Sequence, residues 1–220
     1  MNEDLPERPF RPGMHRFKVL ARHLPVAHAG STWLDLGGGA GEFSLLVANQ
    51  GYEVTLVDGD PRNLANVEAR GIHGVLADLN ATLDTFPDGS FDGVSLLEVV
   101  EHIPAAEQLM REAYRVLRPG GLLLLSTPNA FWWPERLRVV FGRSLKEDGY
   151  HYRFFTLAGT RTLCERAGFV VQHMEFSSPA FGVNGLRRRL LKRPDRTHVP
   201  VPYVLARLFA QTVYVVGRKP

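Results

Sequence analysis

The stretch that decides the fold is Asp35-Leu36-Gly37-Gly38-Gly39-Ala40-Gly41-Glu42-Phe43. Residues 32–36 form a short apolar run that is typical of a buried strand, and residues 41–50 carry apolar side chains at helical spacing. Glycines at the end of a strand let a ligand approach the backbone without a Cβ in the way. The stretch therefore predicts a ligand-binding turn between a strand and a helix.

The order of the glycines indicates a ligand without phosphate groups. A dinucleotide site needs Gly-x-Gly-x-x-Gly, but Glu42 stands at the third glycine position, where its carboxylate would repel a diphosphate. A P-loop needs a lysine directly after its glycines, and none follows here. The spacing Gly37-x-Gly39-x-Gly41 suits a ligand without phosphates.

Two aspartates follow the next two expected strands. Asp58 comes directly after the apolar run 53–57, nineteen residues after Gly39, where a carboxylate can accept hydrogen bonds from both hydroxyls of a ribose. Asp78 follows the run 72–77, where it could accept a hydrogen bond from an adenine amino group. A helix N-cap or an ordinary loop acid is the alternative interpretation of each.

Strands and helices alternate along the first part of the chain, which predicts an α/β fold with a doubly wound, mostly parallel sheet. Strands are expected at 32–36, 53–57, 72–77, 91–97 and 122–126, and helices at 13–24, 41–50, 61–70 and 105–117. Further helices are expected at 131–141, 156–167 and 182–193, and further strands at 169–174 and 212–216. The length of 220 residues fits a single domain over residues 1–220.

Composition excludes several classes of protein. The single cysteine, Cys164, allows no internal disulfide and no cysteine-based zinc site, and core packing is its expected role. The first ten residues are polar and contain prolines, unlike a signal peptide, and the longest apolar runs are too short to span a membrane. We therefore expect a cytoplasmic protein, with contact at a membrane surface as a further option.

Six pieces of the sequence together resemble a class I S-adenosylmethionine-dependent methyltransferase. They are WLDLGGGAGEF, LVDGDP, LADLNATLDTFPDGSFDGV, LLEVVEHI, RVLRPGGLLLLSTPN and HYRFFT…CERAGF, which cover roughly residues 32–176. The resemblance implies a Rossmann-like, seven-stranded sheet whose last strand is antiparallel. Two branches are nearest: the ubiquinone-biosynthesis type of O-methyltransferase and the accessory methyltransferase-like protein of methionine biosynthesis.

The resemblance implies S-adenosylmethionine as cofactor and assigns residues to its parts. It places Asp35, Gly37, Gly39 and Gly41 around the methionine part, Asp58 at the ribose and Asp78, followed by Leu79, at the adenine. Glu98 is a further candidate contact at the methionine end, as one of the competing interpretations of its stretch. No metal is expected for cofactor binding, because the cofactor has no phosphate to bridge.

Two histidines are candidate bases for the methyl acceptor. Glu98, Glu101 and His102 would share one face if this stretch is helical, and the trio is a weaker candidate for a Mg²⁺ site. His102 could instead be a general base, or simply a hydrogen-bonded residue at a helix start. His151 lies where related methyltransferases often border the acceptor site, and a loop histidine bound to backbone is the alternative.

The second part of the chain is strongly basic. Residues 1–129 hold 10 Lys and Arg against 17 Asp and Glu, for a net charge of −7, whereas residues 130–220 hold 16 against 6, for +10. Two inserted segments, 130–155 and 180–210, combine arginines with large apolar residues and are expected to form a helical lid over the acceptor or to contact an anionic membrane. A solvated basic face is the alternative.

These patterns favour methylation of a small-molecule or lipid-like acceptor at oxygen. Nucleic acid is disfavoured as a partner, because Leu97-Glu98-Val99-Val100 replaces the (Asp/Asn)-Pro-Pro-Tyr of base amine methyltransferases and no recognition motif accompanies the basic half. Two rival hypotheses remain: a non-catalytic, methyltransferase-like partner of a biosynthetic enzyme, and an RNA-directed methyltransferase.

Overall fold

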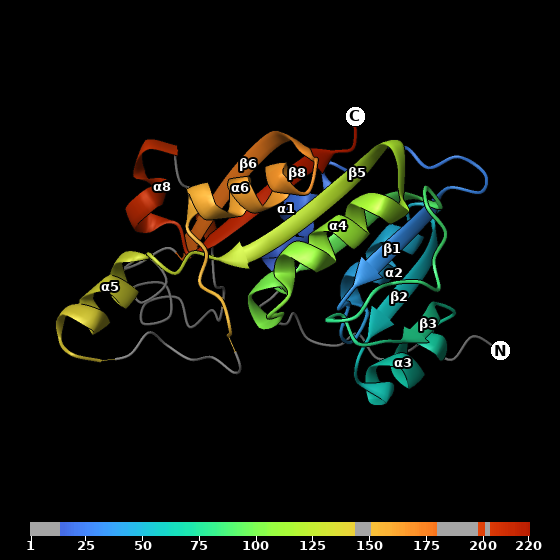
Figure 1. Ribbon diagram of the computed structural model, residues 1–220, viewed down its shortest axis with the longest axis horizontal. Coiled ribbons are helices and arrows are strands. Elements are labelled where there is room, and N and C mark those ends of the chain that lie inside the picture. Colours follow the sequence, from blue (N-terminus) through green and yellow to red (C-terminus); the bar gives the residue numbers. More distant parts are fainter. Residues whose placement is uncertain (1–13, 144–150, 180–197, 201–202) are drawn as a thin grey trace, which may run out of the picture.

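One mixed sheet organises the protein in the computed structural model, which describes residues 14–143, 151–179, 198–200 and 203–220. Within these residues eight strands pair in the order β3-β2-β1-β4-β5-β8-β6-β7 (Figure 1). The strands are β1 (Thr32–Leu36), β2 (Glu53–Asp58), β3 (His73–Leu76), β4 (Phe91–Leu97), β5 (Leu117–Pro128), β6 (Val170–Pro179), β7 (His198–Pro200) and β8 (Thr212–Arg218).

The direction of the strands confirms the expected doubly wound sheet. Strands β1 to β5 pair in parallel, and β8 runs antiparallel to both β5 and β6. The short strand β7, which the sequence did not predict, pairs with β6 at the edge. The chain order reverses between β1 and β4, and ligands of such sheets bind at the carboxyl ends of the strands next to this switch point.

Helices cover both faces of the sheet, and each face has its own apolar core (Figure 1). The helices α4 (Ala106–Val116) and α6 (Leu157–Arg166) cover one face, and α1 (Met14–Ala21), α2 (Glu42–Ala48) and α3 (Pro61–Glu68) cover the other. Helix α4 shows how the sequence specifies this layer, because its apolar residues recur at helical spacing and are buried: Leu109, Met110, Ala113 and Val116.

The structure differs from the expected elements mainly in the second part of the chain. Residues 131–141, expected as a helix, contain the shorter α5 (Trp133–Val140). A 3₁₀ turn, η1 (Val100–His102), and helix α8 (Tyr203–Phe209) were not predicted. The helix expected at 182–193 lies outside the described residues. Among the described helices, none has the length and apolar character needed to cross a bilayer.

Candidate active site

The glycine turn after β1 takes a backbone shape that only glycine adopts easily. Gly37, Gly39 and Gly41 have φ angles of 69°, 55° and 78°. A Cβ on Gly37 would lie 2.7 Å from Val99, and one on Gly41 would lie 2.4 Å from Val67 of α3. A Cβ on Gly39 would meet nothing within 4 Å. The open side of the turn is therefore at Gly39, whereas Gly41 is required by the packing of α3.

Asp35 is the buried carboxylate beneath this turn. Its two oxygens accept hydrogen bonds of 2.6 Å from the hydroxyls of Ser44 and Ser95, and Ser95 in turn accepts one of 2.9 Å from the Trp33 indole. Burial raises the pKa of Asp35 to about 6, although the two hydroxyl donors act in the opposite direction. The site thus holds a carboxylate that is costly to ionise and is fixed in orientation by two serines that sequence reasoning missed.

Asp58 and Asp78 end neighbouring strands, as expected, but each already accepts local hydrogen bonds. The Asp58 carboxylate accepts a hydrogen bond of 3.0 Å from the N–H of Gly39 and one of 2.8 Å from the N–H of Asp60, so it also shapes the glycine turn. Asp78 is exposed and accepts 2.9 Å from the N–H of Asn80. That bond, followed by one from the Asn80 side-chain amide, holds the pKa of the Asp78 carboxyl below its usual range.

A first cavity, of about 220 Å³, opens against the glycine turn. We call it the glycine-loop cavity, and it is lined by Phe17, Asp35, Gly37, Gly38, Gly39, Ala40, Glu42, Phe43, Leu97 and Glu98. Phe17 comes from α1, far from the motif in sequence, and no local signal identified it. Asp58, Asp78 and Leu79 are not among these lining residues. They lie farther along the carboxyl edge of the sheet, where Leu79 packs beside Gly37.

Glu98 lies at the end of β4 with a φ of 60°, a strained conformation for a residue with a side chain. Two hydrogen bonds connect Glu98 to Ser126 of β5. The Glu98 N–H donates to the Ser126 carbonyl at 2.9 Å, and the Ser126 hydroxyl donates to the Glu98 carboxylate at 2.8 Å. Glu98 lines the glycine-loop cavity and also a second cavity. It is therefore the described residue at which the two spaces meet.

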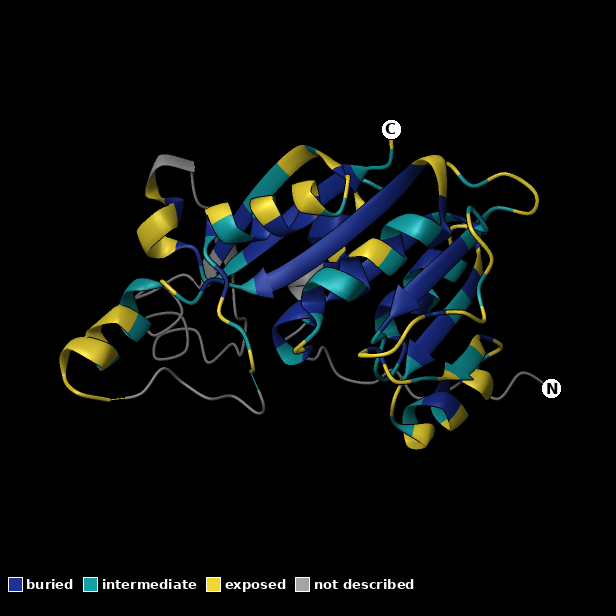
Figure 2. Cartoon of the chain, in the orientation of Figure 1, coloured by how far each residue is buried: buried dark blue, intermediate teal, exposed yellow. Residues whose placement is uncertain are grey.

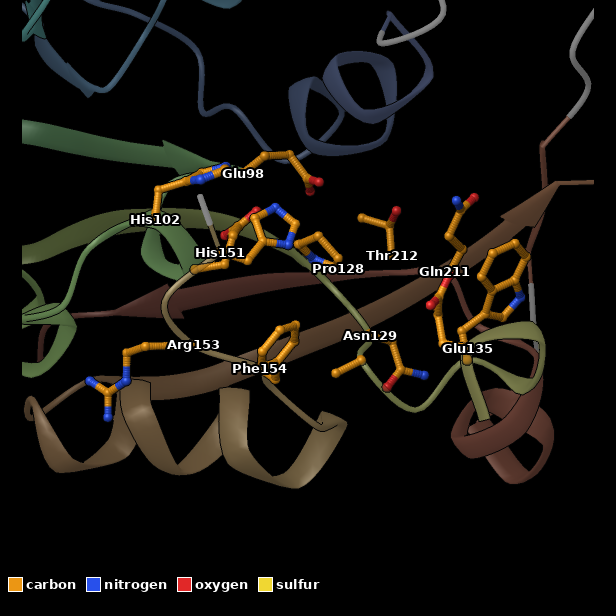
Figure 3. Close-up of a pocket in the computed structure, with 13 residues that line it drawn as sticks. Glu98, His102, Pro128, Asn129, Glu135, His151, Arg153, Phe154, Gln211 and Thr212 are labelled. Carbon is orange, nitrogen blue, oxygen red and sulfur yellow. The ribbon is translucent and has the colours of Figure 1, made fainter. Parts of the chain in front are cut away.

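The second cavity, of about 260 Å³, is assembled from segments that are distant in sequence (Figure 3). We call it the histidine cavity, and its lining is Glu98, Glu101, His102, Pro128, Asn129, Ala130, Trp132, Glu135, His151, Arg153, Phe154, Gln211 and Thr212. Asn129 joins these segments: its N–H donates to the Gln211 carbonyl at 2.7 Å and its side-chain amide donates to the Ala210 carbonyl at 2.9 Å. Sequence reasoning missed Asn129, although it ends the matching piece RVLRPGGLLLLSTPN.

The two candidate histidines are brought together in this cavity. The rings of His102 and His151 have centroids 4.6 Å apart, and Figure 3 shows them turned toward each other beside Glu98. The buried Glu101 lies next to them, and its carboxylate accepts 3.1 Å from the Thr127 hydroxyl. Ligand atoms of Glu101, His102 and His151 all lie within 4.8 Å of one another, so these three could hold a metal ion.

The expected metal trio therefore changes in one member. Glu98, Glu101 and His102 do not share a helical face, because Glu98 has a positive φ and precedes the 3₁₀ turn that contains the other two residues. The described cluster takes its third ligand from His151 instead. A sequence pattern could not reveal this, because His151 lies in a loop about fifty residues away.

The loop that carries His151 is fastened to η1 and α4. The backbone N–H groups of Tyr152 and Arg153 donate to the Glu101 carbonyl at 2.9 and 3.2 Å. The Arg153 guanidinium forms an ion pair with Glu107 of α4, and its hydrogen bonds hold the pKa of Glu107 below its usual range. In Figure 3 the guanidinium of Arg153 points away from the two histidines, so Arg153 lines the edge of the cavity and fixes the loop through Glu107.

Other predicted features fall outside the two cavities. Cys164 is buried in α6, and burial raises the pKa of its thiol to about 12, which supports a packing role. Of the first inserted segment, residues 130–143 and 151–155 are described, and they contribute to the histidine cavity. Of the second, residues 198–200, which form β7, and residues 203–210, which contain α8, are described. Residues 180–197, including the basic run 187–193 and Phe181, lie outside the described residues.

Comparison with known proteins identifies the family. A sequence profile for the methyltransferase domain matches residues 3–174. A probable S-adenosylmethionine-dependent methyltransferase of Mycolicibacterium smegmatis is 35% identical over 164 residues, which are 71% of this chain and 59% of the relative. A ubiquinone biosynthesis O-methyltransferase of Xanthomonas oryzae is 33% identical over 139 residues, 58% of this chain and 57% of the relative. The chain thus spans less than two thirds of these curated relatives.

Solved structures agree on the fold. An S-adenosylmethionine-dependent methyltransferase from Mesorhizobium loti superposes with a TM-score of 0.69 at 21% identity, over 94% of this chain and 98% of that chain. An S-adenosylmethionine-dependent methyltransferase from Archaeoglobus fulgidus also superposes with a TM-score of 0.69, at 20% sequence identity, and the match covers 94% of each chain. From its sequence match and its fold, this chain belongs to the methyltransferase domain family, among the class I S-adenosylmethionine-dependent methyltransferases.

Proposed function

We propose that this protein transfers a methyl group from S-adenosylmethionine to a hydroxyl oxygen of a small-molecule or lipid-like acceptor. The observation that carries the proposal is that Glu98 lines two cavities at once, one against the glycine turn and one containing His102 and His151. A methyl donor in the first cavity and a hydroxyl acceptor in the second would meet beside Glu98. This is the arrangement that an in-line transfer requires.

The glycine-loop cavity fits the proposed cofactor. The space above Gly39 is open, so a ligand can lie directly against the backbone, and the carboxylates of Asp35 and Glu98 suit the positive charges of a sulfonium and an ammonium group. We assign the contacts as follows, from the methionine end to the adenine: Glu98, Asp35, Gly37 and Gly39, then Asp58, then Asp78 with Leu79. Gly41 would act indirectly, by letting α3 pack against the turn.

The histidines would supply the base. S-adenosylmethionine, when bound, provides a methyl group on a positively charged sulfur. The acceptor oxygen must lose its proton as its bond to the methyl carbon forms, and a neutral imidazole can take that proton near neutral pH. His102 and His151 both line the acceptor space, so either is positioned for this role. Trp132 and Phe154 add apolar walls that would hold the acceptor body and exclude water.

A metal ion at Glu101, His102 and His151 is the alternative use of the same residues. Two imidazoles and one carboxylate suit a first-row divalent ion, which could bind the acceptor oxygen and favour its ionised form. Exhaustive chelation separates the two versions. Full activity with chelator would exclude the metal version and leave the histidines as bases. Activity that is lost with chelator and restored by added metal would support the metal version.

The choice of oxygen and of a lipid-like acceptor rests on two supports. The Xanthomonas oryzae relative is named as an O-methyltransferase of ubiquinone biosynthesis. The histidine cavity combines candidate bases with aromatic walls, which suits a phenolic or prenylated acceptor. Peripheral contact with an anionic membrane would deliver such an acceptor. We propose that segments 130–155 and 180–210 serve as a lid over the acceptor space.

The test is release of S-adenosylhomocysteine with a panel of acceptors. We expect turnover with a catechol that carries an isoprenoid chain, weaker turnover with unsubstituted catechol, and none with the matching primary amine or with tRNA. Turnover on tRNA alone would favour the RNA-directed rival. Cofactor binding by calorimetry without turnover on any acceptor would favour the non-catalytic partner.

A further inference from the structure

Several large apolar side chains of α5 and α8 are exposed to solvent among the residues whose side chains the structure describes. Ala206, in the middle of α8, and Ala210, directly after the helix, are small residues and are buried. The large α8 residues Leu205, Leu208 and Phe209 are 43–48% exposed. At the end of α5, Val140 and Phe141 are 74% and 77% exposed. A helix of a globular protein normally buries its large apolar face, so this arrangement calls for a partner.

The exposed apolar side chains lie on two neighbouring helices. Leu205, Leu208 and Phe209 are spaced to share one face of α8, as Leu137, Val140 and Phe141 are on α5. The two helices touch, because the Arg136 guanidinium donates to the Arg207 carbonyl at 3.3 Å. Both helices lie at the same end of the molecule, with exposed residues along them (Figures 1 and 2). We call these six apolar residues, together with Arg136, Arg138, Arg143 and Arg207, the α5–α8 surface.

The charge of this surface selects the partner. Residues 131–143 and 203–211 contain four arginines, at 136, 138, 143 and 207, and one acid, Glu135, which pairs with Arg138 at 3.5 Å. A second copy of the chain would bring the arginines of two such surfaces together, and like charges in contact are unfavourable. Apolar side chains beside arginines suit the interface of an anionic bilayer, where the former enter the acyl boundary and the latter meet phosphate.

The surface also adjoins the acceptor space. Trp132 and Glu135, at the start of α5, and Gln211 and Thr212, directly after α8, line the histidine cavity. We propose that the α5–α8 surface docks on anionic membranes, so that an acceptor with a lipid tail can enter the histidine cavity from the bilayer. The docking itself stands on exposure and charge, and only its purpose rests on the proposed function.

Vesicle sedimentation with the full chain tests the proposal. We expect binding to vesicles of phosphatidylcholine and phosphatidylglycerol at three to one, at least tenfold weaker binding in 0.5 M salt, and little binding to phosphatidylcholine alone. Each arginine near an anionic surface contributes roughly fivefold in affinity. Arg143→Ser with Arg207→Ser should therefore reduce binding about twenty-fivefold, and Val140→Ser with Phe141→Ser should reduce it at least tenfold.

Matched controls lie elsewhere on the surface. Val26→Ser with Arg166→Ser also removes an exposed apolar residue and an exposed arginine, and should leave vesicle binding unchanged. All variants should keep the thermal midpoint and the S-adenosylmethionine affinity of the wild type, because none of these residues lines the glycine-loop cavity. A variant that melts early is replaced by the single change Phe141→Ser.

Three results would overturn the docking proposal. The first is wild-type protein that does not bind anionic vesicles at low salt, and the second is surface variants that bind like the wild type. The third is a salt-resistant dimer that the same surface variants dissociate, which would assign the surface to a second copy. Methylation of soluble catechol without vesicle binding would reject docking alone, and vesicle binding without turnover on any acceptor would reject the proposed function alone.

Discussion

The glycine-loop cavity and the histidine cavity share Glu98 but are built in different ways. Most residues of the first come from one strand end and the turn that follows it, and the turn is constrained by glycine conformation and by the buried Asp35. The second collects residues from the segment after β4 with η1, the end of β5, α5, the loop before α6 and the start of β8. Asn129 and the Glu101 carbonyl join these segments. The first is a local motif and the second is a product of tertiary structure. Substitutions should therefore separate cofactor binding from acceptor use.

The largest expected effect is on the histidine side. His102→Gln or His151→Gln should lower kcat by roughly 10²–10⁴ if that residue is the base, because an unassisted hydroxyl keeps its proton. Affinity for S-adenosylmethionine should not change, since neither histidine lines the glycine-loop cavity. The measurements are turnover on prenylated catechol and cofactor titration by calorimetry.

A matched histidine controls this experiment. His173 lies on β6 with its ring against His23, at a centroid distance of 5.6 Å, and outside the histidine cavity. His173→Gln should keep full turnover. A cofactor affinity that fell together with kcat in the His102 or His151 variant would contradict the separation of the two cavities.

The second effect concerns pH and stability on the glycine side. Burial raises the pKa of Asp35 to about 6, above its unfolded value of about 3.9, so the folded state holds this proton more tightly. The contribution of Asp35 to stability is therefore greatest below pH 4 and falls as the pH rises from 4 to 6. The free energy of unfolding of the wild type relative to Asp35→Asn should drop by about 2 kcal/mol over that range.

Urea unfolding of both proteins at several pH values measures this difference. Salt is the control, because a shift caused by burial persists at high ionic strength whereas one caused by distant charges does not. Parallel pH profiles for wild type and Asp35→Asn would show that the carboxylate is not held in a buried, costly state.

A third effect concerns the expected ribose contact. Asp58→Ala should weaken S-adenosylmethionine binding by roughly 1.5–3 kcal/mol, through the loss of charge-assisted hydrogen bonds to the ligand and of the bond to Gly39. Asp60→Ala is the neighbouring control, because the Asp60 side chain caps α3 by accepting from the Arg62 backbone N–H, and its loss should lower stability without lowering cofactor affinity. Calorimetry on both variants compares them, and an unchanged affinity in Asp58→Ala would remove Asp58 from the site.

The difference between the cavities also explains what the sequence could predict. The glycine turn, the strands before and after it and the positions of Asp58 and Asp78 follow from local patterns, and the structure has them as expected. The same patterns could not reveal that Phe17 reaches the turn from α1, or that His151 meets His102, because these contacts depend on how distant segments pack. They also gave a wrong geometry for Glu98, whose left-handed backbone no helical spacing indicates.

The smallest effect comes from a matched pair of glycines. Gly39 and Gly30 both have positive φ angles, 55° and 77°, and an added Cβ would meet nothing within 4 Å at either position. Substitution by alanine at either position should therefore lower the free energy of unfolding by about 1 kcal/mol, through backbone strain alone. Only at Gly39 does the new methyl group enter the glycine-loop cavity, so Gly39→Ala should also lose about tenfold in S-adenosylmethionine affinity, while Gly30→Ala should lose none. Equal affinities in the two variants, with equal melting temperatures, would mean that the cofactor does not lie against Gly39 and that the open side of the turn serves another ligand.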